Sequence, residues 1–89
     1  MTISNKPELK KSLVIREEFD DYAILFDPDT SLACAINPVS VFICRQLNGQ
    51  RTVDEIVDGI RQTFTEVPDE LKEDVQSFLD DLADRQMLQ

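Results

Sequence analysis

The apolar residues of this 89-residue chain follow two different periods, and the change between them falls near residue 37. From Leu13 to Ile36 the chain is rich in β-branched and aromatic residues, and its apolar positions alternate as in half-buried strands. From Val39 to Leu82 apolar residues recur every three or four positions, which is typical of amphipathic helices. The sequence therefore predicts a sheet followed by helices in one domain, because so short a chain supports a single core.

Two turn signals divide the first region into three strands. Asp20-Asp21 separates the first strand from the second, and Asp27-Pro28-Asp29-Thr30 has the residues of a type I turn. The second and third strands are therefore expected to form a hairpin within an antiparallel sheet. Residues 1–11 are poor in apolar side chains and are expected to form a flexible N-terminal arm before the domain of residues 12–89.

Three helices are predicted after the sheet. Asn37 suits the N-cap of the first and Pro38 its first helical position. Thr52 and Glu55 have the spacing of a capping box at the start of the second, and the third begins after Pro68. The fold class is thus α+β, a three-stranded antiparallel sheet covered on one face by three helices.

Charge and composition argue against several classes of function. The formal net charge of −9 repels phosphate backbones and anionic membrane surfaces. The chain contains no histidine, so the usual acid–base residue near neutral pH is missing, and its two glycines do not form a calcium or phosphate loop. No segment has the apolar run of a signal peptide or a membrane span, which predicts a cytoplasmic location.

The remaining reactive groups do not form a recognisable catalytic motif. Cys34 and Cys44 lack a histidine base and do not form a C-x-x-C pair, so we expect them to be small, largely apolar core residues. Neighbouring acids such as Asp80-Asp81 point in different directions on a helix and are expected to be solvated. The sequence therefore predicts no catalytic residue, no metal site and no cofactor.

The two edges of the predicted sheet differ. The first strand is flanked by charges, including Lys10, Lys11 and Arg16, which discourage strand pairing. The third strand, residues 31–36, contains no charge and no proline, and most of its side chains are small. This pattern predicts the capture of an extended peptide as an added strand, with the third helix as the wall of the binding groove. Cover by a helix, or pairing with a second copy in a homodimer, are the alternatives.

Several short segments occur in a characteristic order along nearly the whole chain. In this order and spacing they resemble the PqqD family, the small peptide-binding domains also called RiPP recognition elements. The segments Arg16-Glu17-Glu18 and Pro28-Asp29-Thr30 are similar to members found in SynChlorMet-type peptide-modification cassettes. The segments that show the family resemblance are Val14 to Glu18, Ala23 to Thr30, Ile36-Asn37-Pro38, Phe42-Ile43, Leu47-Asn48-Gly49, Thr52 to Val57, Asp74-Val75 and Phe78 to Leu82.

This resemblance implies a winged helix-turn-helix fold in which the leader of a precursor peptide joins the third strand and lies against the third helix. It also implies a peptide chaperone without a cofactor, which passes the precursor to a modifying enzyme, often a radical SAM protein. A winged-helix regulatory or nucleic-acid-binding domain and an acid-dependent hydrolase are the alternatives. Carried onto this sequence, the peptide-binding residues are Leu32, Ala33, Cys34 and Ala35 in the third strand, and Lys72, Val75, Gln76 and Leu79 in the third helix.

Overall fold

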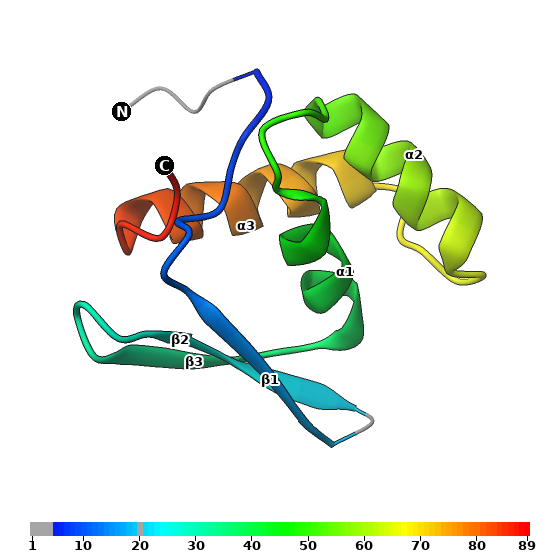
Figure 1. Cartoon of the computed structure of the whole chain (residues 1–89). Coiled ribbons are helices and arrows are strands. Elements are labelled where there is room, and N and C mark those ends of the chain that lie inside the picture. Colours follow the sequence, from blue (N-terminus) through cyan, green and yellow to red (C-terminus); the bar gives the residue numbers. More distant parts are fainter. Residues whose placement is uncertain (1–4, 20) are drawn as a thin grey trace.

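Three strands are followed by three helices, in the order that the sequence predicts. The computed structural model describes residues 5–19 and 21–89. Figure 1 shows the helices together on one side of the sheet, as expected for an α+β layout. The elements are β1 (Val14–Phe19), β2 (Tyr22–Asp27), β3 (Leu32–Ile36), α1 (Pro38–Gln46), α2 (Val53–Thr63) and α3 (Leu71–Asp84).

The sheet is antiparallel with the strand order β1-β2-β3. Along β2 the residues alternate, so that Ala23, Leu25 and Asp27 are buried beneath the helices while the residues between them are more exposed. Leu25 lies opposite Cys34 of β3, and Ala23 lies opposite Ile36. This register places every second residue of β3 on the helix-covered face and leaves the backbone of β3 at the rim of the sheet.

The first two helices begin at the residues that the sequence indicates. The side chain of Asn37 accepts a hydrogen bond of 2.8 Å from the N–H of Ser40 at the start of α1. At the start of α2, Thr52 and Glu55 form both hydrogen bonds of a capping box. Each cap fixes where its helix starts, and the short connection from β3 into α1 therefore has a defined course.

The third helix presents one apolar stripe to the core. Leu71, Val75, Leu79 and Leu82 are all buried, and they are spaced by three or four residues as the helical period requires. Its first turn contains the acids Glu73 and Asp74, which interact favourably with the positive end of the helix dipole. The stripe joins a core formed mainly by Ala23, Leu25, Ile36, Ile43, Cys44, Leu47, Ile56, Val57, Ile60 and Met87.

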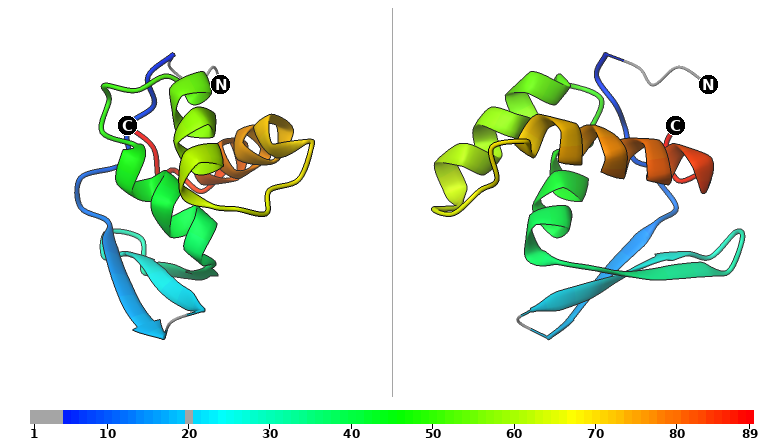
Figure 2. Two further views of the ribbon diagram at one scale, coloured as in Figure 1. Left: turned by 90° about the vertical axis from the view of Figure 1, so that its right-hand side faces the viewer. Right: turned by 180° about the vertical axis from the view of Figure 1, so that it is seen from behind.

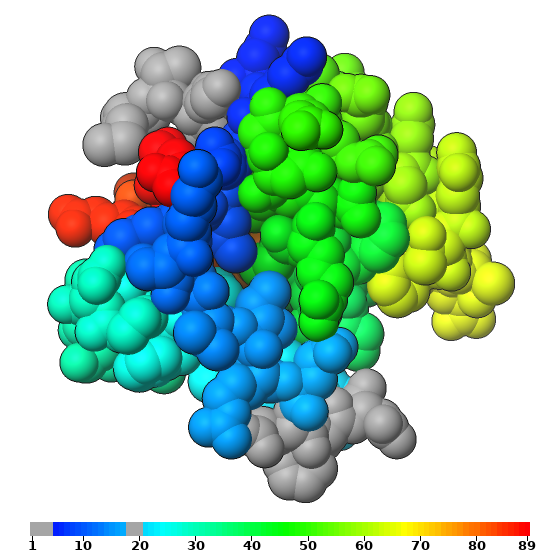
Figure 3. Space-filling view, in the orientation of Figure 1, coloured from blue at the N-terminus to red at the C-terminus, as the bar shows by residue number. Residues whose placement is uncertain are grey.

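Part of the predicted N-terminal arm is bonded to the domain, which differs from the expectation of a flexible segment. Gly49 donates its N–H to the carbonyl of Pro7, and Leu9 donates to the carbonyl of Leu47. Lys10 donates to the carbonyl of Met87, so one short segment joins the α1–α2 connection to the C-terminal residues. Figure 3 shows the N-terminal segment in blue between these two regions. Residues 1–4 of the predicted arm lie outside the described residues.

Candidate functional site

The outer edge of β3 is the first component of the candidate site. In the described part of the chain β3 pairs only with β2, so its other rim has backbone N–H and C=O groups without a strand partner. Leu32 is 43% exposed, and Ala33 and Ala35 are also exposed. The small residues leave the backbone accessible, and the edge can accept an additional strand.

The opposite edge, β1, is less suited to pairing. Its register with β2 shifts between Arg16 and Phe19, which is a bulge or similar irregularity in the ladder. Oε2 of Glu17 lies 3.0 Å from Nη2 of Arg45, so an ion pair links this strand to α1. Irregular backbone and charged side chains both discourage the addition of a strand. The contrast between the two edges agrees with the sequence pattern.

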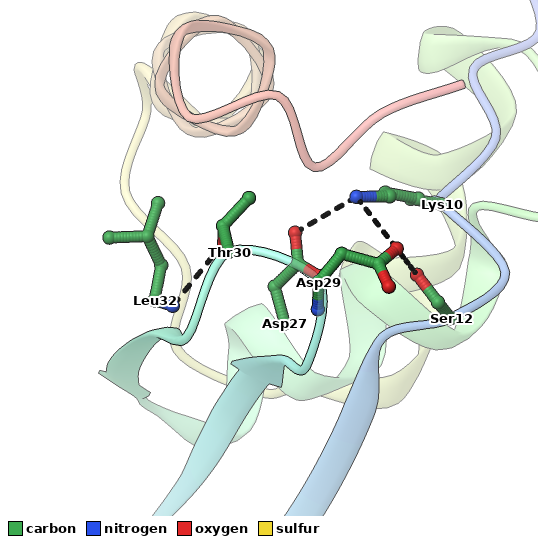
Figure 4. Close-up of polar contacts among 6 residues, drawn as sticks. All are labelled: Lys10, Ser12, Asp27, Asp29, Thr30 and Leu32. Atoms are coloured by element: carbon green, nitrogen blue, oxygen red, sulfur yellow. Dashed lines mark hydrogen bonds and ion pairs between the residues drawn. The ribbon is translucent and has the colours of Figure 1, made fainter.

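A buried carboxylate fixes the loop that leads into β3. Oδ1 of Asp27 accepts a hydrogen bond of 2.9 Å from the N–H of Asp29, and its Oδ2 lies 3.1 Å from Nζ of Lys10 (Figure 4). Oγ1 of Thr30 then accepts a hydrogen bond of 3.3 Å from the N–H of Leu32, the first residue of β3. These contacts hold the hairpin loop in one conformation, so the start of the open edge is well defined.

The protonation of this cluster follows from its contacts. Burial alone would raise the pKa of Asp27. The hydrogen bonds from Lys10 and from the N–H of Asp29, together with the charge of Lys10, lower this pKa by more than burial raises it. The pKa of Asp27 therefore lies below its usual value. The hydrogen bond to Asp27 is the largest influence on Lys10 and raises the pKa of its ammonium group. Both groups are therefore charged across the neutral range.

A groove between α1 and α3 is the second component of the site. Its volume is about 320 Å³, near the lower end of the range for small-molecule pockets. It begins where β3 ends, because Asn37 directly follows Ile36 and the next lining residues come from the first turns of α1. Most of its surface is apolar. The lining residues are Asn37, Val39, Ser40, Ile43, Pro68, Leu71, Asp74, Val75 and Phe78.

The structure separates the four predicted residues of α3 into different environments. Val75 and Leu79 are both buried in the core, but only Val75 also lines the groove. Nζ of Lys72 lies 2.7 Å from Oδ1 of Asp54, so this side chain is directed toward α2. Nε2 of Gln76 donates a hydrogen bond to Asp80 on the exposed face of the same helix. Of these four residues, only Val75 lines the groove. The other lining residues are ones that the sequence interpretation did not select.

Three of the groove-lining residues that the sequence interpretation did not select share one face of α3. Leu71, Asp74 and Phe78 occupy this face with Val75, at intervals of three and four residues. Phe78 and Leu71 belong to the apolar stripe of the sequence, so the periodic signal was present. Val39 and Ile43 on α1 have the same spacing, and only their position beside α3 in the folded chain shows that they share a groove.

The cysteines are placed as structural residues. Cys44 is buried, and burial together with the nearby Cys34 raises the pKa of its thiol to about 12. A thiol of this kind is a poor nucleophile at neutral pH. Cys34 is half-buried on β3, and both cysteines are free.

Within residues 5–19 and 21–89, no three metal-binding side chains of the His, Cys, Asp and Glu types gather at one place.

Comparison of the folded chain with solved structures defines its class. The chain resembles a structure described as TbiB1 in complex with the TbiA(beta) leader peptide, with a TM-score of 0.73 and 23% sequence identity. The match covers 92% of this chain and 94% of that one, so the two share the α+β fold of three strands followed by three helices.

Among the described residues, no helix is long and apolar enough to cross a membrane.

Sequence comparison identifies the family. The model for coenzyme PQQ synthesis protein D (PqqD) matches residues 22–88, and the chain therefore belongs to the PqqD family. The chain is also 30% identical over 66 residues to the PqqA binding protein of Rhizobium meliloti (strain 1021). That match covers 74% of this chain and 65% of the relative, so it spans slightly less than two thirds of the relative's length.

Proposed function

We propose that this chain binds the leader of a ribosomally made precursor peptide as an antiparallel strand on β3 and presents it to a modifying enzyme. The observation that supports this most directly is the open, uncharged edge of β3, which leads into an apolar groove. The names of two similar proteins also support it, since one is called a PqqA binding protein and the other is described with a leader peptide. The chain itself would act as an adaptor rather than an enzyme.

The two components of the site would contribute different parts of the binding. The backbone of Leu32 to Ala35 would exchange hydrogen bonds with the peptide main chain, which gives affinity with little dependence on sequence. The groove would receive peptide side chains beside Val75 and Phe78, which gives selectivity. Ordering a flexible peptide offsets part of the contact energy, so we expect micromolar affinity, about −8 kcal/mol.

The modifying enzyme is proposed to be a radical SAM protein, which would hold any iron–sulfur cluster itself. The family resemblance supports this choice. Two free cysteines, one of them half-buried at the sheet edge, are consistent with a reducing compartment, and we propose that the protein works in the cytoplasm. Co-purification of this chain with candidate radical SAM enzymes from the same genome, in the presence and absence of a leader peptide, tests the pairing.

An amide NMR titration tests strand capture. The probe is a synthetic peptide with the leader sequence of a candidate precursor from the same genome. We expect the largest shifts at Leu32 to Ala35 and along the groove face of α3, from Leu71 to Phe78. Shifts centred on α2, or no binding at all, would contradict the proposal.

Proline substitution identifies the edge itself. Neighbouring residues of a strand direct their N–H groups to opposite sides, so one of Ala33 and Cys34 donates toward β2 and the other toward the open rim. We would prepare Ala33→Pro and Cys34→Pro and test binding with the variant that keeps the native amide spectrum. Loss of binding in that folded variant is expected, because proline removes a donor from the rim. Unchanged binding would show that the peptide does not use this edge.

The same open edge also supports self-association as a competitor. Two copies of β3 can pair about a twofold axis and extend the sheet across both subunits. Such a homodimer would occupy the site that the leader uses. Sedimentation over a range of protein concentrations, with and without the leader peptide, tests this, and the peptide is expected to shift any dimer toward the monomer.

A further inference from the structure

The groove lies at one particular end of β3. Asn37 follows the last strand residue, Ile36, and lines the groove together with Val39 and Ser40 from the start of α1. The opposite wall is the first half of α3, with Pro68 just before that helix. Figure 2 shows, from behind, β3 leading into α1 at the end where α3 begins. The groove is therefore beyond the Ile36 end of the open edge and not beside the hairpin loop.

The position of the groove fixes the order of two parts of a bound peptide: the residue that enters the groove and the residues that pair with β3. An antiparallel added strand starts opposite Ile36 and ends opposite Leu32. A peptide residue in the groove must therefore come before the residues that pair with β3. A parallel strand would require the reverse order. The position of the groove residue, here called the anchor, before or after the pairing residues therefore shows whether the added strand is antiparallel or parallel to β3.

The lining of the groove defines the chemistry of the residue that enters it. Five side chains on its two walls are apolar: Val39 and Ile43 from α1, and Leu71, Val75 and Phe78 from α3. Ile43, Leu71 and Val75 are buried and form the floor of the groove, while Val39 and Phe78 are half-buried and supply its accessible apolar surface. A large aliphatic or aromatic side chain is the group that such a surface binds best.

Asp74 adds a charge preference to this surface. It is the single charged residue among those lining the groove, and its side chain is exposed. The nearest lysine in sequence, Lys72, is paired with Asp54 on the side of α2. No cation is paired with Asp74 among the described residues. The net charge of −9 also attracts a basic peptide toward the chain.

We infer that this chain selects peptides in which a large apolar residue, with Lys or Arg beside it, immediately precedes an extended segment that contains no proline. This inference rests on the proposed function, because the extended segment is the one that pairs with Leu32 to Ala35. It goes further by placing the apolar anchor before the extended segment and by assigning a positive charge to the residue beside the anchor. The groove is then a specificity site for the N-terminal part of the bound segment.

Selection from a displayed library of random peptides tests the inference without knowledge of the natural precursor. The full chain is the target, and the folded proline variant of β3 is the control that separates edge-dependent peptides from all others. We expect edge-dependent peptides to be enriched in an apolar residue and a neighbouring Lys or Arg, both on the N-terminal side of a β-branched segment. Enrichment of the anchor on the C-terminal side, or of acidic neighbours, would overturn the inference while leaving strand capture intact. A library without edge-dependent peptides would overturn both.

Charge reversal at Asp74 tests the same point on selected peptides. For a peptide with Lys beside the anchor, Asp74→Lys is expected to weaken binding about two- to fivefold at low salt, as for other exposed ion pairs. For the matching peptide with Glu in place of Lys, the same variant is expected to bind more tightly than the native chain. Glu73→Lys is the matched control, because it makes the same change of charge in the same turn of α3 but does not line the groove. Equal effects of the two variants would show that only net charge matters. Altered self-association in Asp74→Lys would indicate a second copy as the occupant, and either result would contradict the inference.

Discussion

Nζ of Lys10 lies 3.1 Å from Oδ2 of Asp27, whose side chain is completely buried at the end of β2. The same Nζ lies 3.2 Å from Oδ2 of Asp29 in the loop that leads to β3. Since the main chain of Lys10 is also bonded to Met87, this residue connects the hairpin with the C-terminal part of the helical layer. The open edge and the layer that contains the groove are thereby held in one arrangement.

Neutralising Asp27 is expected to change how stability depends on pH. The folded pKa of this carboxyl lies below its ordinary value of 3.8, so its charge stabilises the folded chain above about that pH. This contribution is lost as the pH falls through the lower, folded pKa. The raised pKa of Lys10 has the opposite sign: its contribution is complete below 10.5 and is lost as the pH rises through the folded value.

Asp27→Asn should therefore be less stable than the native chain at neutral pH, and its free energy of unfolding should decrease less between pH 5 and pH 3. Urea unfolding at a series of pH values measures both effects. Asp29→Asn is the comparison, because the Asp29 side chain is 60% exposed and should matter less. Parallel pH profiles for Asp27→Asn and the native chain would contradict the proposed role of this carboxylate.

Removal of residues 1–11 is expected to destabilise the domain. The deletion abolishes main-chain hydrogen bonds to Leu47, Gly49, Met87 and Gln89, each of which contributes about 1 kcal/mol. Thermal unfolding followed by circular dichroism measures the loss. Lys10→Met is the control, because it removes the ion pair but keeps the main chain. If the deleted chain and Lys10→Met unfold at the same temperature, the main-chain contacts contribute nothing.

The order of the elements and two of the three helix caps could be predicted from the sequence because their signals are local. A capping box or a type I turn depends on side chains a few residues apart. The contacts of Pro7 and Leu9 gave no such signal, since they are main-chain hydrogen bonds to residues far along the chain. Any residue except proline can donate such a bond, so composition alone suggested a flexible arm.

The predicted face of α3 illustrates the same distinction. The predicted residues 72, 75, 76 and 79 and the groove-lining residues 71, 74, 75 and 78 differ by a shift of one position, which is about 100° around a helix. The apolar period indicates which stripe faces the core. It does not indicate which flank of that stripe lies beside α1, because that depends on how the helices cross. The peptide contacts of α3 stay a prediction.

Truncation within α3 should separate core residues from surface residues. Leu79 is fully buried, so Leu79→Ala is expected to lower the free energy of unfolding by about 2–5 kcal/mol. Gln76→Ala removes only an exposed hydrogen bond to Asp80 and should change it by about 0.5 kcal/mol or less. Urea unfolding compares the two variants. Similar values for both would contradict the burial of Leu79.

The two thiols should react at very different rates in the folded chain. Burial and the nearby Cys34 raise the pKa of Cys44 to about 12, so this thiol is expected to react with a disulfide reagent at pH 8 only after unfolding. Cys34, half-buried on the open strand, is expected to react in the native state. Cys34→Ser should therefore leave no fast-reacting thiol. A fast reaction that persists in this variant would show that Cys44 is accessible.

Paired substitutions on α3 should decide which face of the helix the peptide contacts. Phe78 is half-buried and lines the groove, so Phe78→Ala is expected to weaken the binding of a peptide with a large apolar anchor by more than about 1 kcal/mol, roughly fivefold or more. Lys72→Ala removes an exposed ion pair with Asp54 and should change the affinity less than about twofold, because that side chain is directed toward α2. Isothermal titration with one selected peptide measures both, after amide spectra confirm that each variant is folded. A large loss in Lys72→Ala with unchanged binding in Phe78→Ala would place the peptide on the other flank of α3. The residues first predicted from the family resemblance would then describe the site better than the groove does.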